Sequence, residues 1–354
     1  MDKLVSILST IYPVVQGPML GVTTPEMVAA VSNGGALGSL PIGGLSPGSA
    51  RELIRKTKQL TSGRYSVNLF AHRVPPTVDE TGLDRMQDYL EQYTKERKLP
   101  FTRRAASEFR FYSYEEQVDM LLEERTPVIS STFGILAPEV IERFKANGVL
   151  LIGTATSVAE AVTLEQAGVD IITAQGIEAG GHRGSFLEEE LPQVGLFSLL
   201  PQVADAVSRP VLAAGGIVDG RTIRAAFALG AAGVQVGTLF IPSHESAASE
   251  TYKDAVVSAK DTDTALTRAF SGRWARGIRN EFMQSMEAAG VPIPKYTLQN
   301  SLTAEIRSYG RAHNLPDIVS LWAGQSAGKT RKAGAAELLR QLVKDIDFES
   351  YLFG

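Results

Sequence analysis

The fold is decided by the stretch PVLAAGGIVDGRTIRAAFALGAAGVQVGTLF, residues 210–240. Its two apolar runs, 210–217 and 233–240, show no alternation of polar and apolar residues, which is typical of parallel strands buried on both faces. Between the runs, Asp219 can cap a helix that ends at Gly230, where a glycine turns the chain back at little conformational cost. The stretch therefore predicts a strand, a helix and a second, parallel strand.

The same unit recurs along the chain. A glycine followed at once by a strand-like run appears as NGV at 147–149 and as AGV at 167–169 and 232–234. The strand-like runs number eight, at 13–19, 36–42, 65–71, 127–134, 149–155, 170–176, 210–217 and 233–240. Eight β–α units that close on themselves form a TIM (β/α)8 barrel, an α/β fold. An open doubly wound sheet remains the alternative, because β–α alternation alone does not show closure.

Two segments exceed what a barrel needs. A charged, helical segment at about 75–117 is inserted after the third strand, and a long segment, 241–354, follows the eighth. We therefore expect a barrel domain over 1–240 that carries this insert, and a mostly helical C-terminal extension over 241–354 that packs on the barrel.

Composition excludes several classes of protein. The 354 residues carry a formal net charge of -4, so neither nucleic acid nor a membrane is an expected partner. The chain has no cysteine, which excludes disulfides, iron–sulfur clusters, thiolate-bound zinc and a cysteine nucleophile. No apolar run approaches the ~20 residues that span a bilayer. No two histidines are spaced as metal ligands, so we expect no metal. Because the chain lacks cysteine, a membrane-spanning run and a strong signal-peptide pattern, we expect a cytoplasmic protein.

In a TIM barrel the active site lies at the C-terminal ends of the strands. Glycines and polar residues gather at these positions: Gln16, Gly17, Pro18, Met19, Asn68, Gln175, Gly180, Gly181, Gly215, Gly216, Gln235, Gly237 and Thr238. The loops after the seventh and eighth strands are glycine-rich, which lets backbone N–H groups approach an anion. They predict a phosphate site, although the same glycines can also serve only tight turns.

His182 lies in GIEAGGHRG, residues 176–184, among glycines rather than among packing side chains. This setting favours a base or a hydrogen bond to a substrate anion, over a loop histidine that caps backbone. His72 follows the third strand and is a weaker candidate, and we expect His244 and His313 to lie on the surface.

Neither of two common nucleotide-binding motifs is present in full. AGQSAGKT, residues 323–330, resembles a phosphate-binding loop, but Ala323 replaces its first glycine and too little chain follows to build the required sheet. No two glycines anywhere in the chain are spaced i, i+2, so the dinucleotide-binding pattern G-x-G-x-x-G is absent.

Several stretches together resemble the nitronate monooxygenase family, formerly called 2-nitropropane dioxygenases. They are QGPM (16–19), VSNGGALGSL (31–40), VNLF (67–70), AQGIEAGGHRG (174–184), the stretch 213–240, KYTLQN (295–300) and WAGQ (322–325). The resemblance implies a TIM barrel that binds FMN, with His182 as catalytic residue and Gln16 to Met19 near the isoalloxazine ring. It places the flavin-binding pattern on Asn68, Gln175, Gly180, Gly216, Gln235, Val236, Gly237 and Thr238.

The resemblance implies oxidation of alkyl nitronates by O2, without NAD(P)H, to an aldehyde or ketone and nitrite. Nitroalkanes are possible further substrates, and a homodimer is a possible assembly. A protonated His182 would attract the anionic nitronate, whereas a neutral one would take the α-proton of a nitroalkane; both roles stay open. Lys295 and Tyr296 would approach the site if the C-terminal segment folds over the barrel mouth.

Three other functions remain as alternatives. Flavin-dependent NAD(P)H enoyl-ACP reductases share the fold and a GGH motif of this kind. A flavin-free, phosphate-binding aldolase or isomerase is disfavoured, because no lysine falls within any strand run. A non-catalytic flavin-binding protein is the third alternative.

Overall fold

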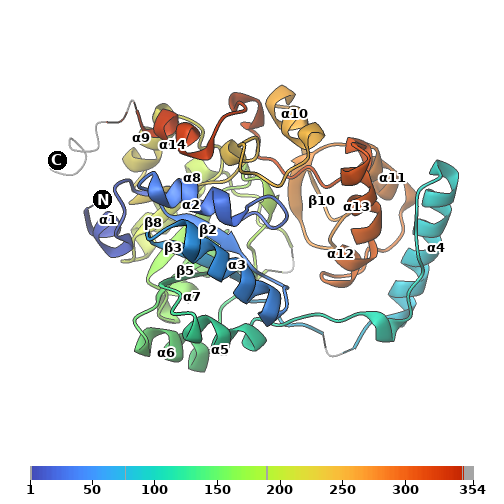
Figure 1. Ribbon diagram of the computed structural model, residues 1–354, viewed down its shortest axis with the longest axis horizontal. Helices are drawn as coiled ribbons and strands as arrows, with labels where there is room; N and C mark the ends of the chain where they lie inside the picture. The colour runs from blue at the N-terminus through green and yellow to red at the C-terminus, as the bar shows by residue number, and fades with distance from the viewer. Residues whose placement is uncertain (1, 76, 189, 345, 347–354) are drawn as a thin grey trace.

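The computed structural model describes residues 2–75, 77–188, 190–344 and 346 (Figure 1). Residue 76 of the predicted insert and residues 345 and 347–354 of the predicted C-terminal segment lie outside the described residues, as does Met1.

Eight parallel strands form the centre of the molecule. They are β1 (Val14–Gln16), β2 (Gly38–Pro41), β3 (Tyr65–Phe70), β4 (Val128–Thr132), β5 (Leu150–Ala155), β6 (Ile171–Gln175), β8 (Val211–Ala214) and β9 (Gly233–Val236). Their order is β1-β9-β8-β6-β5-β4-β3-β2. A parallel bridge between Val15 and Leu37 joins the two ends, and there the Gln16 amide donates to the Leu37 carbonyl over 2.8 Å. The sheet is thus a TIM barrel, and the open-sheet alternative is excluded.

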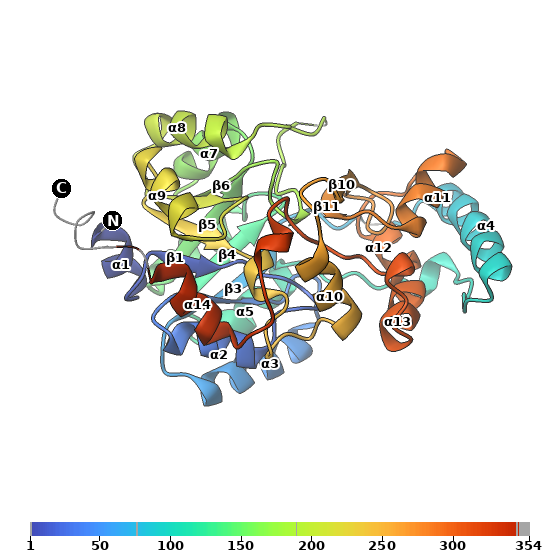
Figure 2. The same ribbon diagram turned by 90° about the horizontal axis from the view of Figure 1, so that it is seen from above.

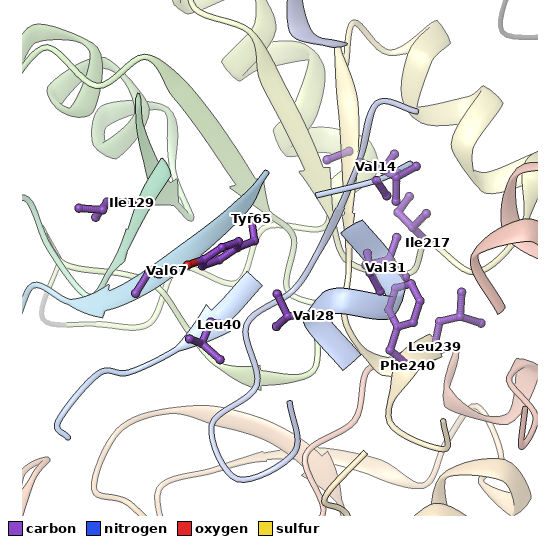
Figure 3. Packing of buried hydrophobic residues seen from close by; sticks show 14 of the residues in the cluster. Val14, Val28, Val31, Leu40, Tyr65, Val67, Ile129, Ile217, Leu239 and Phe240 are labelled. Carbon is purple, nitrogen blue, oxygen red and sulfur yellow. The ribbon is translucent and has the colours of Figure 1, made fainter. Parts of the chain in front are cut away.

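Helices cover the outside of the barrel. They are α2 (Pro25–Asn33), α3 (Pro47–Leu60), α5 (Glu115–Glu123), α6 (Pro138–Ala146), α7 (Val158–Gln166), α8 (Leu196–Ala206) and α9 (Gly220–Ala228), with α1 (Asp2–Leu8) at one end. The predicted cap of α9 is confirmed, because the Asp219 carboxylate accepts from the Arg221 and Thr222 amides. Branched apolar side chains such as Val28, Val31 and Val67 fill the space between helices and strands (Figure 3).

The chain after residue 240 is not helical throughout. It contains α10 (Glu250–Ser258), α11 (Glu281–Ala289), α12 (Leu298–Leu302), α13 (Ala304–Ala312) and α14 (Ala335–Val343), but also the strands β10 (Thr264–Thr267) and β11 (Ala275–Ile278). β11 pairs antiparallel with β10 and with the two-residue strand β7 (Gly181–His182). The C-terminal segment therefore holds His182 by strand pairing, a contact that the sequence did not indicate.

The insert packs on the C-terminal segment rather than on the barrel. Its helix α4 (Glu80–Arg97) lies beside α11 in both views (Figures 1 and 2). Leu90 and Tyr93 of α4 share a hydrophobic cluster with Phe270 and Phe282, and the Tyr93 and Phe282 rings meet edge to face at 5.2 Å. This second cluster joins residues from both sides of position 240. The division into 1–240 and 241–354 remains a prediction.

Candidate functional site

A cavity of about 430 Å³ opens at the C-terminal ends of the strands, where the C-terminal segment meets the barrel. A volume of this size is typical of small-ligand sites. With the single exception of Gln16, the residues predicted for the site all line it: Gly17, Pro18, Met19, Asn68, Gln175, Gly180, Gly181, His182, Gly215, Gly216, Gln235, Val236, Gly237 and Thr238.

Gln16 lies behind the lining and supports it. Its side chain is fully buried. Nε2 donates to the Gly17 carbonyl and, over 2.9 Å, to Thr23 Oγ1, and Oε1 accepts from the Ser39 amide at 3.0 Å. The carboxamide is therefore fully engaged, and it fixes the loop that presents Gly17, Pro18 and Met19 to the cavity.

One end of the cavity is bare backbone. Gly215 and Gly216 adopt φ of +121° and +70°, which L side chains rarely adopt, and a Cβ at Gly216 would meet nothing within 4 Å. Gly237 and Thr238 follow β9, the strand that pairs with β8, and they line the cavity as well. Such a cradle of glycine backbone next to the N-terminus of α9 suits an anionic group.

The segment 323–330, whose sequence resembles a phosphate-binding loop, reaches this end of the cavity. Its structure differs from that of a phosphate-binding loop. The Gly324 amide donates to Thr238 Oγ1 over 3.0 Å, and Ser326 Oγ donates to the Gly216 carbonyl over 3.3 Å. The residues that follow, Ala327–Lys329, form a single 3₁₀ turn instead of the long helix of a phosphate-binding loop. The segment therefore closes the cavity as a cover.

The glycine-rich loop 176–184 is held rigidly. Arg183 is fully buried, and its two terminal nitrogens donate to the carbonyls of Gln175 and Gly176 over 2.7 and 2.6 Å. The Gln175 carboxamide donates to the His182 carbonyl and accepts from the Gly184 amide. Gln175 thus lines the cavity while its polar atoms fix the loop.

Gly180 is needed for packing. A Cβ there would lie 2.5 Å from the Gly324 nitrogen and 2.6 Å from the Ala323 carbonyl carbon. Those are backbone atoms and cannot rotate away. The missing side chain therefore lets the C-terminal segment approach the loop. Glu178, four residues before His182, accepts from the Leu196 amide at the start of α8 and is structural.

Two carboxamides retain free polar atoms in the cavity wall. Asn68 Nδ2 donates to Ser130 Oγ at 3.0 Å and to Thr132 Oγ1 at 3.1 Å, which leaves Oδ1 without a partner in the described part of the chain. Gln235 Oε1 accepts weakly from Thr173 at 3.5 Å, which leaves Nε2 as a donor. An acceptor and a donor of this kind suit the amide-like edge of a flavin ring.

His182 Nε2 lies 2.8 Å from Ser271 Oγ. The same hydroxyl donates to the Arg273 carbonyl at 3.1 Å, and it has only one hydrogen. All three groups are satisfied when Nε2–H donates to Ser271, so the hydrogen-bond network assigns the Nε2–H tautomer. Nδ1 then carries a free lone pair.

The imidazole of His182 is neutral near pH 7. Burial, together with the charges of Arg273 and Arg307, lowers the pKa of His182 to about 3. Of the two roles left open by the sequence, the neutral one is favoured.

Aromatic rings surround His182. The ring centroids of Trp322, Phe133 and Tyr296 lie 5.3, 5.7 and 6.1 Å from that of His182. Tyr296 lines the cavity, whereas Lys295 is exposed and does not. These rings form an apolar wall that restricts water beside the imidazole.

The other histidines lie outside the cavity lining. Both ring nitrogens of His72 are buried without a partner in the described chain, and burial followed by the charge of Arg273 lowers the pKa of His72 to about 4. His244 and His313 are exposed, as expected.

Sequence reasoning missed Phe133, Ser271, Arg273 and Arg307. Trp322 stands in WAGQ, one of the stretches that carried the family resemblance, although no role was predicted for it. Ser271 and Arg273 lie in the turn before β11, and no motif marked them.

Comparison with known proteins places the chain. The family model described as "Nitronate monooxygenase" matches residues 2–345. The chain belongs to the nitronate monooxygenase family. As a member of that family it is a flavin-dependent oxidoreductase that acts on a small molecule. The described chain contains no helix with the length and apolar character needed to cross a membrane.

Individual relatives and solved structures resemble the chain over nearly its whole length. A probable nitronate monooxygenase of Staphylococcus aureus (strain Newman) is 41% identical over 350 residues, which cover 98% of this chain and 97% of that protein. The structure of nitroalkane oxidase from Streptomyces ansochromogenes superposes with a TM-score of 0.88 at 31% identity, over 99% of each chain. FabK from Thermotoga maritima gives a TM-score of 0.76 at 28% identity, over 99% of this chain and 96% of its own.

Proposed function

We propose that the protein binds FMN and oxidises alkyl nitronates with O2, without NAD(P)H, to an aldehyde or ketone and nitrite. The observation that carries this proposal is the neutral His182, which faces a cavity whose described lining contains two arginines and no carboxylate. Such a cavity favours a small anion. A cytoplasmic location and a homodimer remain predictions from the sequence.

The cavity fits FMN. Gly215, Gly216, Gly237 and Thr238 form a cradle for its phosphate, since backbone N–H groups and a helix N-terminus stabilise an anion. The free carboxamide atoms of Asn68 and Gln235 suit the polar edge of the ring. Bound FMN would supply an acceptor for electrons from the nitronate and a donor of electrons to O2.

The residues of the chain bind and orient the substrate. A nitronate has already lost its α-proton, so its oxidation needs no base, and His182 acts by positioning. A nitroalkane still carries that proton, and Nδ1 of His182 is the atom that can take it. The charges of Arg273 and Arg307 reach His182 and favour the anion, while Phe133 and Trp322 exclude water.

Oxygen uptake by the purified, flavin-loaded protein tests the proposal. The substrate is a simple nitronate such as propyl-1-nitronate, with and without NADPH. Two nitronates and one O2 balance as two carbonyl products and two nitrites, so we expect nitrite to form in that ratio to oxygen and without NADPH. Oxidation of NADPH with no nitronate turnover would contradict the proposal and favour the enoyl-ACP reductase alternative.

A further inference from the structure

Phe133 has a backbone conformation that is unusual for an aromatic residue. It follows β4 directly and has φ of +75°, in the left-handed region that an L side chain adopts only at a cost. The other non-glycine residues with positive φ in the described chain all come within two residues of the end of a helix, where this conformation is common: Ser9, Lys98, Arg125 and Asn314. Phe133 differs from them because it ends a strand and lines the cavity.

The residues on each side of Phe133 hold it in this conformation. The Ala71 amide, at the end of β3, donates to the Thr132 carbonyl over 2.8 Å. On the other side, Gly134 passes so close to β3 that a Cβ there would lie 2.7 Å from the Ala71 carbonyl oxygen. The chain is therefore fixed before and after Phe133, and the packing of the barrel mouth maintains the strain between them.

This conformation places the Phe133 ring at the centre of the aromatic wall. The ring centroids of Phe70, His182 and Tyr296 lie 4.7, 5.7 and 5.7 Å from that of Phe133. Cζ of Arg273 lies over the ring at 4.2 Å from its centroid, within the range of a cation–π interaction. Phe133 lines the cavity and Arg273 does not, so the ring stands between the guanidinium and the cavity.

The Arg273 guanidinium has no carboxylate partner in the part of the chain that the structure describes. Its Nε donates to the Arg183 carbonyl at 3.3 Å, and its Nη2 donates to the Ser185 carbonyl. Burial lowers the pKa of Arg273 to about 10, which still leaves the group charged near pH 7. The guanidinium is thus a buried cation that two neutral carbonyls and the face of the Phe133 ring stabilise.

An uncovered guanidinium beside the cavity would bind small anions directly, because charge-assisted hydrogen bonds are strong. The proposed reaction forms such an anion, nitrite, which must leave before the next turnover. With the ring in place, the charge of Arg273 still acts on His182, but no hydrogen bond to an anion in the cavity can form. Without the ring, Arg273 would retain the product.

We propose that Phe133 is a positioning residue that acts through Arg273: its strained backbone holds the ring over the guanidinium and so prevents the retention of nitrite. The inference goes beyond the proposed function and rests on it only for the identity of the anion. Phe133 itself neither accepts a proton nor donates an electron.

Nitrite binding tests the inference directly. The oxidised, flavin-loaded protein is titrated with sodium nitrite and followed by its flavin absorbance, and nitrite inhibition of oxygen uptake is measured in parallel. Phe133→Gly removes the ring and suits φ of +75°, so we expect this variant to fold. Nitrite should bind to it about tenfold more tightly than to the wild type, the effect of one charge-assisted hydrogen bond. Formamide, a neutral molecule of similar size, should show no such gain.

Three further variants show whether Arg273 causes the gain. Phe133→Leu keeps a smaller apolar cover, so nitrite affinity should rise less than in Phe133→Gly. Addition of Arg273→Met to Phe133→Gly should abolish the gain, because the guanidinium is then absent. Phe197→Leu changes an exposed ring of α8 and should leave nitrite binding at the wild-type level.

Thermal unfolding tests the strain separately. Glycine is normally less stabilising than alanine, but at a positive φ the order reverses, because alanine then carries the strain of its Cβ. We therefore expect a higher Tm for Phe133→Gly than for Phe133→Ala.

Three results would overturn the inference. The first is an equal nitrite affinity in folded Phe133→Gly and the wild type. The second is an equal gain for nitrite and formamide, which would mean that loss of the ring merely enlarges the cavity. The third is a Tm of Phe133→Ala at or above that of Phe133→Gly. A wild-type protein that turns over without releasing nitrite would instead refute the proposed function, and the titration would still decide whether Phe133 covers Arg273.

Discussion

Nε2 of His182 lies 2.8 Å from Oγ of Ser271, and the Ser271 hydroxyl is directed to the carbonyl of Arg273. This arrangement makes the serine an acceptor for the imidazole N–H. It therefore fixes the tautomer that leaves Nδ1 as the basic atom of His182. Because β11 follows this turn and pairs with β7, the C-terminal segment sets both the position and the tautomer of the imidazole.

Ser271→Ala removes the partner of Nε2. The imidazole can then adopt either tautomer, so we expect kcat with a nitroalkane, whose α-proton must be removed, to fall about tenfold. With a nitronate the fall should be smaller. Ser271→Thr keeps the hydroxyl and should restore most of the activity. Equal rates in Ser271→Ala and the wild type with the nitroalkane would show that the serine does not position the base.

His182→Asn removes the base and keeps a polar side chain of similar size. We expect kcat with a nitroalkane to fall by roughly 10²–10⁴, the usual contribution of a positioned base. Flavin content should stay at the wild-type level, because the cradle and the carboxamides of Asn68 and Gln235 are untouched. Full turnover in this variant would instead support a flavin-binding protein in which the histidine has no catalytic part.

The pH dependence of catalysis follows from the pKa of His182. Burial and two nearby arginines lower that pKa to about 3, below the ordinary value of 6.5. The neutral imidazole therefore persists as the pH falls through 6.5. We expect kcat/KM for a nitroalkane to show no loss between pH 8 and about 5 that is due to this histidine. An inflection near the ordinary value that disappears in His182→Asn would contradict the assignment.

His72 affects stability in acid. Burial lowers its pKa to about 4, so between the ordinary value of 6.5 and about 4 the unfolded chain binds more protons than the folded one. Stability should therefore be fully present above pH 6.5 and should decrease as the pH falls.

His72→Phe tests this effect, because it keeps a ring against Tyr296 and Phe133 and removes the unpaired nitrogens. We expect the Tm to fall less between pH 7 and pH 5 in this variant than in the wild type. Over this pH range the free energy of unfolding should fall by on the order of 1–3 kcal/mol more in the wild type than in His72→Phe. His244→Gln, on the surface, is the control. An identical acid sensitivity in His72→Phe would refute the prediction.

Gly180→Ala should displace the segment 323–330, which covers one end of the cavity, because the new Cβ would lie 2.5 Å from the Gly324 nitrogen. We expect a lower Tm and weaker flavin retention, measured by the flavin content after gel filtration. Gly48→Ala is a matched control within α3, where the nearest atom is the Ser46 hydroxyl at 4.0 Å, and it should be neutral or slightly stabilising. Equal flavin retention in both variants would count against close packing as the role of Gly180.

The barrel strands could be predicted from the sequence because they are short apolar runs, several of which begin directly after a glycine that ends a helix. Closure of the barrel could not be predicted, since it depends on the bridge between Val15 and Leu37. The hairpin of β10 and β11 was missed because ARGI and TALT are short and half-polar, and their pairing with Gly181 and His182 is a long-range contact.

Some residues of the candidate site could likewise be predicted from the sequence, and others could not. Residues at strand ends, such as Gly216 and Gln235, could be predicted because the barrel places every strand end around one mouth. Ser271 and Arg307 could not be predicted, because they belong to the C-terminal segment, which reaches the site through long-range packing that includes the insert. Arg307 also looks like any polar residue of an amphipathic helix until its neighbours are known.

The most direct test of the central claim is the anaerobic mixing of flavin-loaded protein with propyl-1-nitronate in the absence of NAD(P)H. The visible flavin absorbance should decrease on mixing and return when O2 is admitted, with release of nitrite. If the absorbance stays unchanged with the nitronate but decreases when NADPH is added, electrons do not pass from nitronate to flavin. The proposed function would then be wrong.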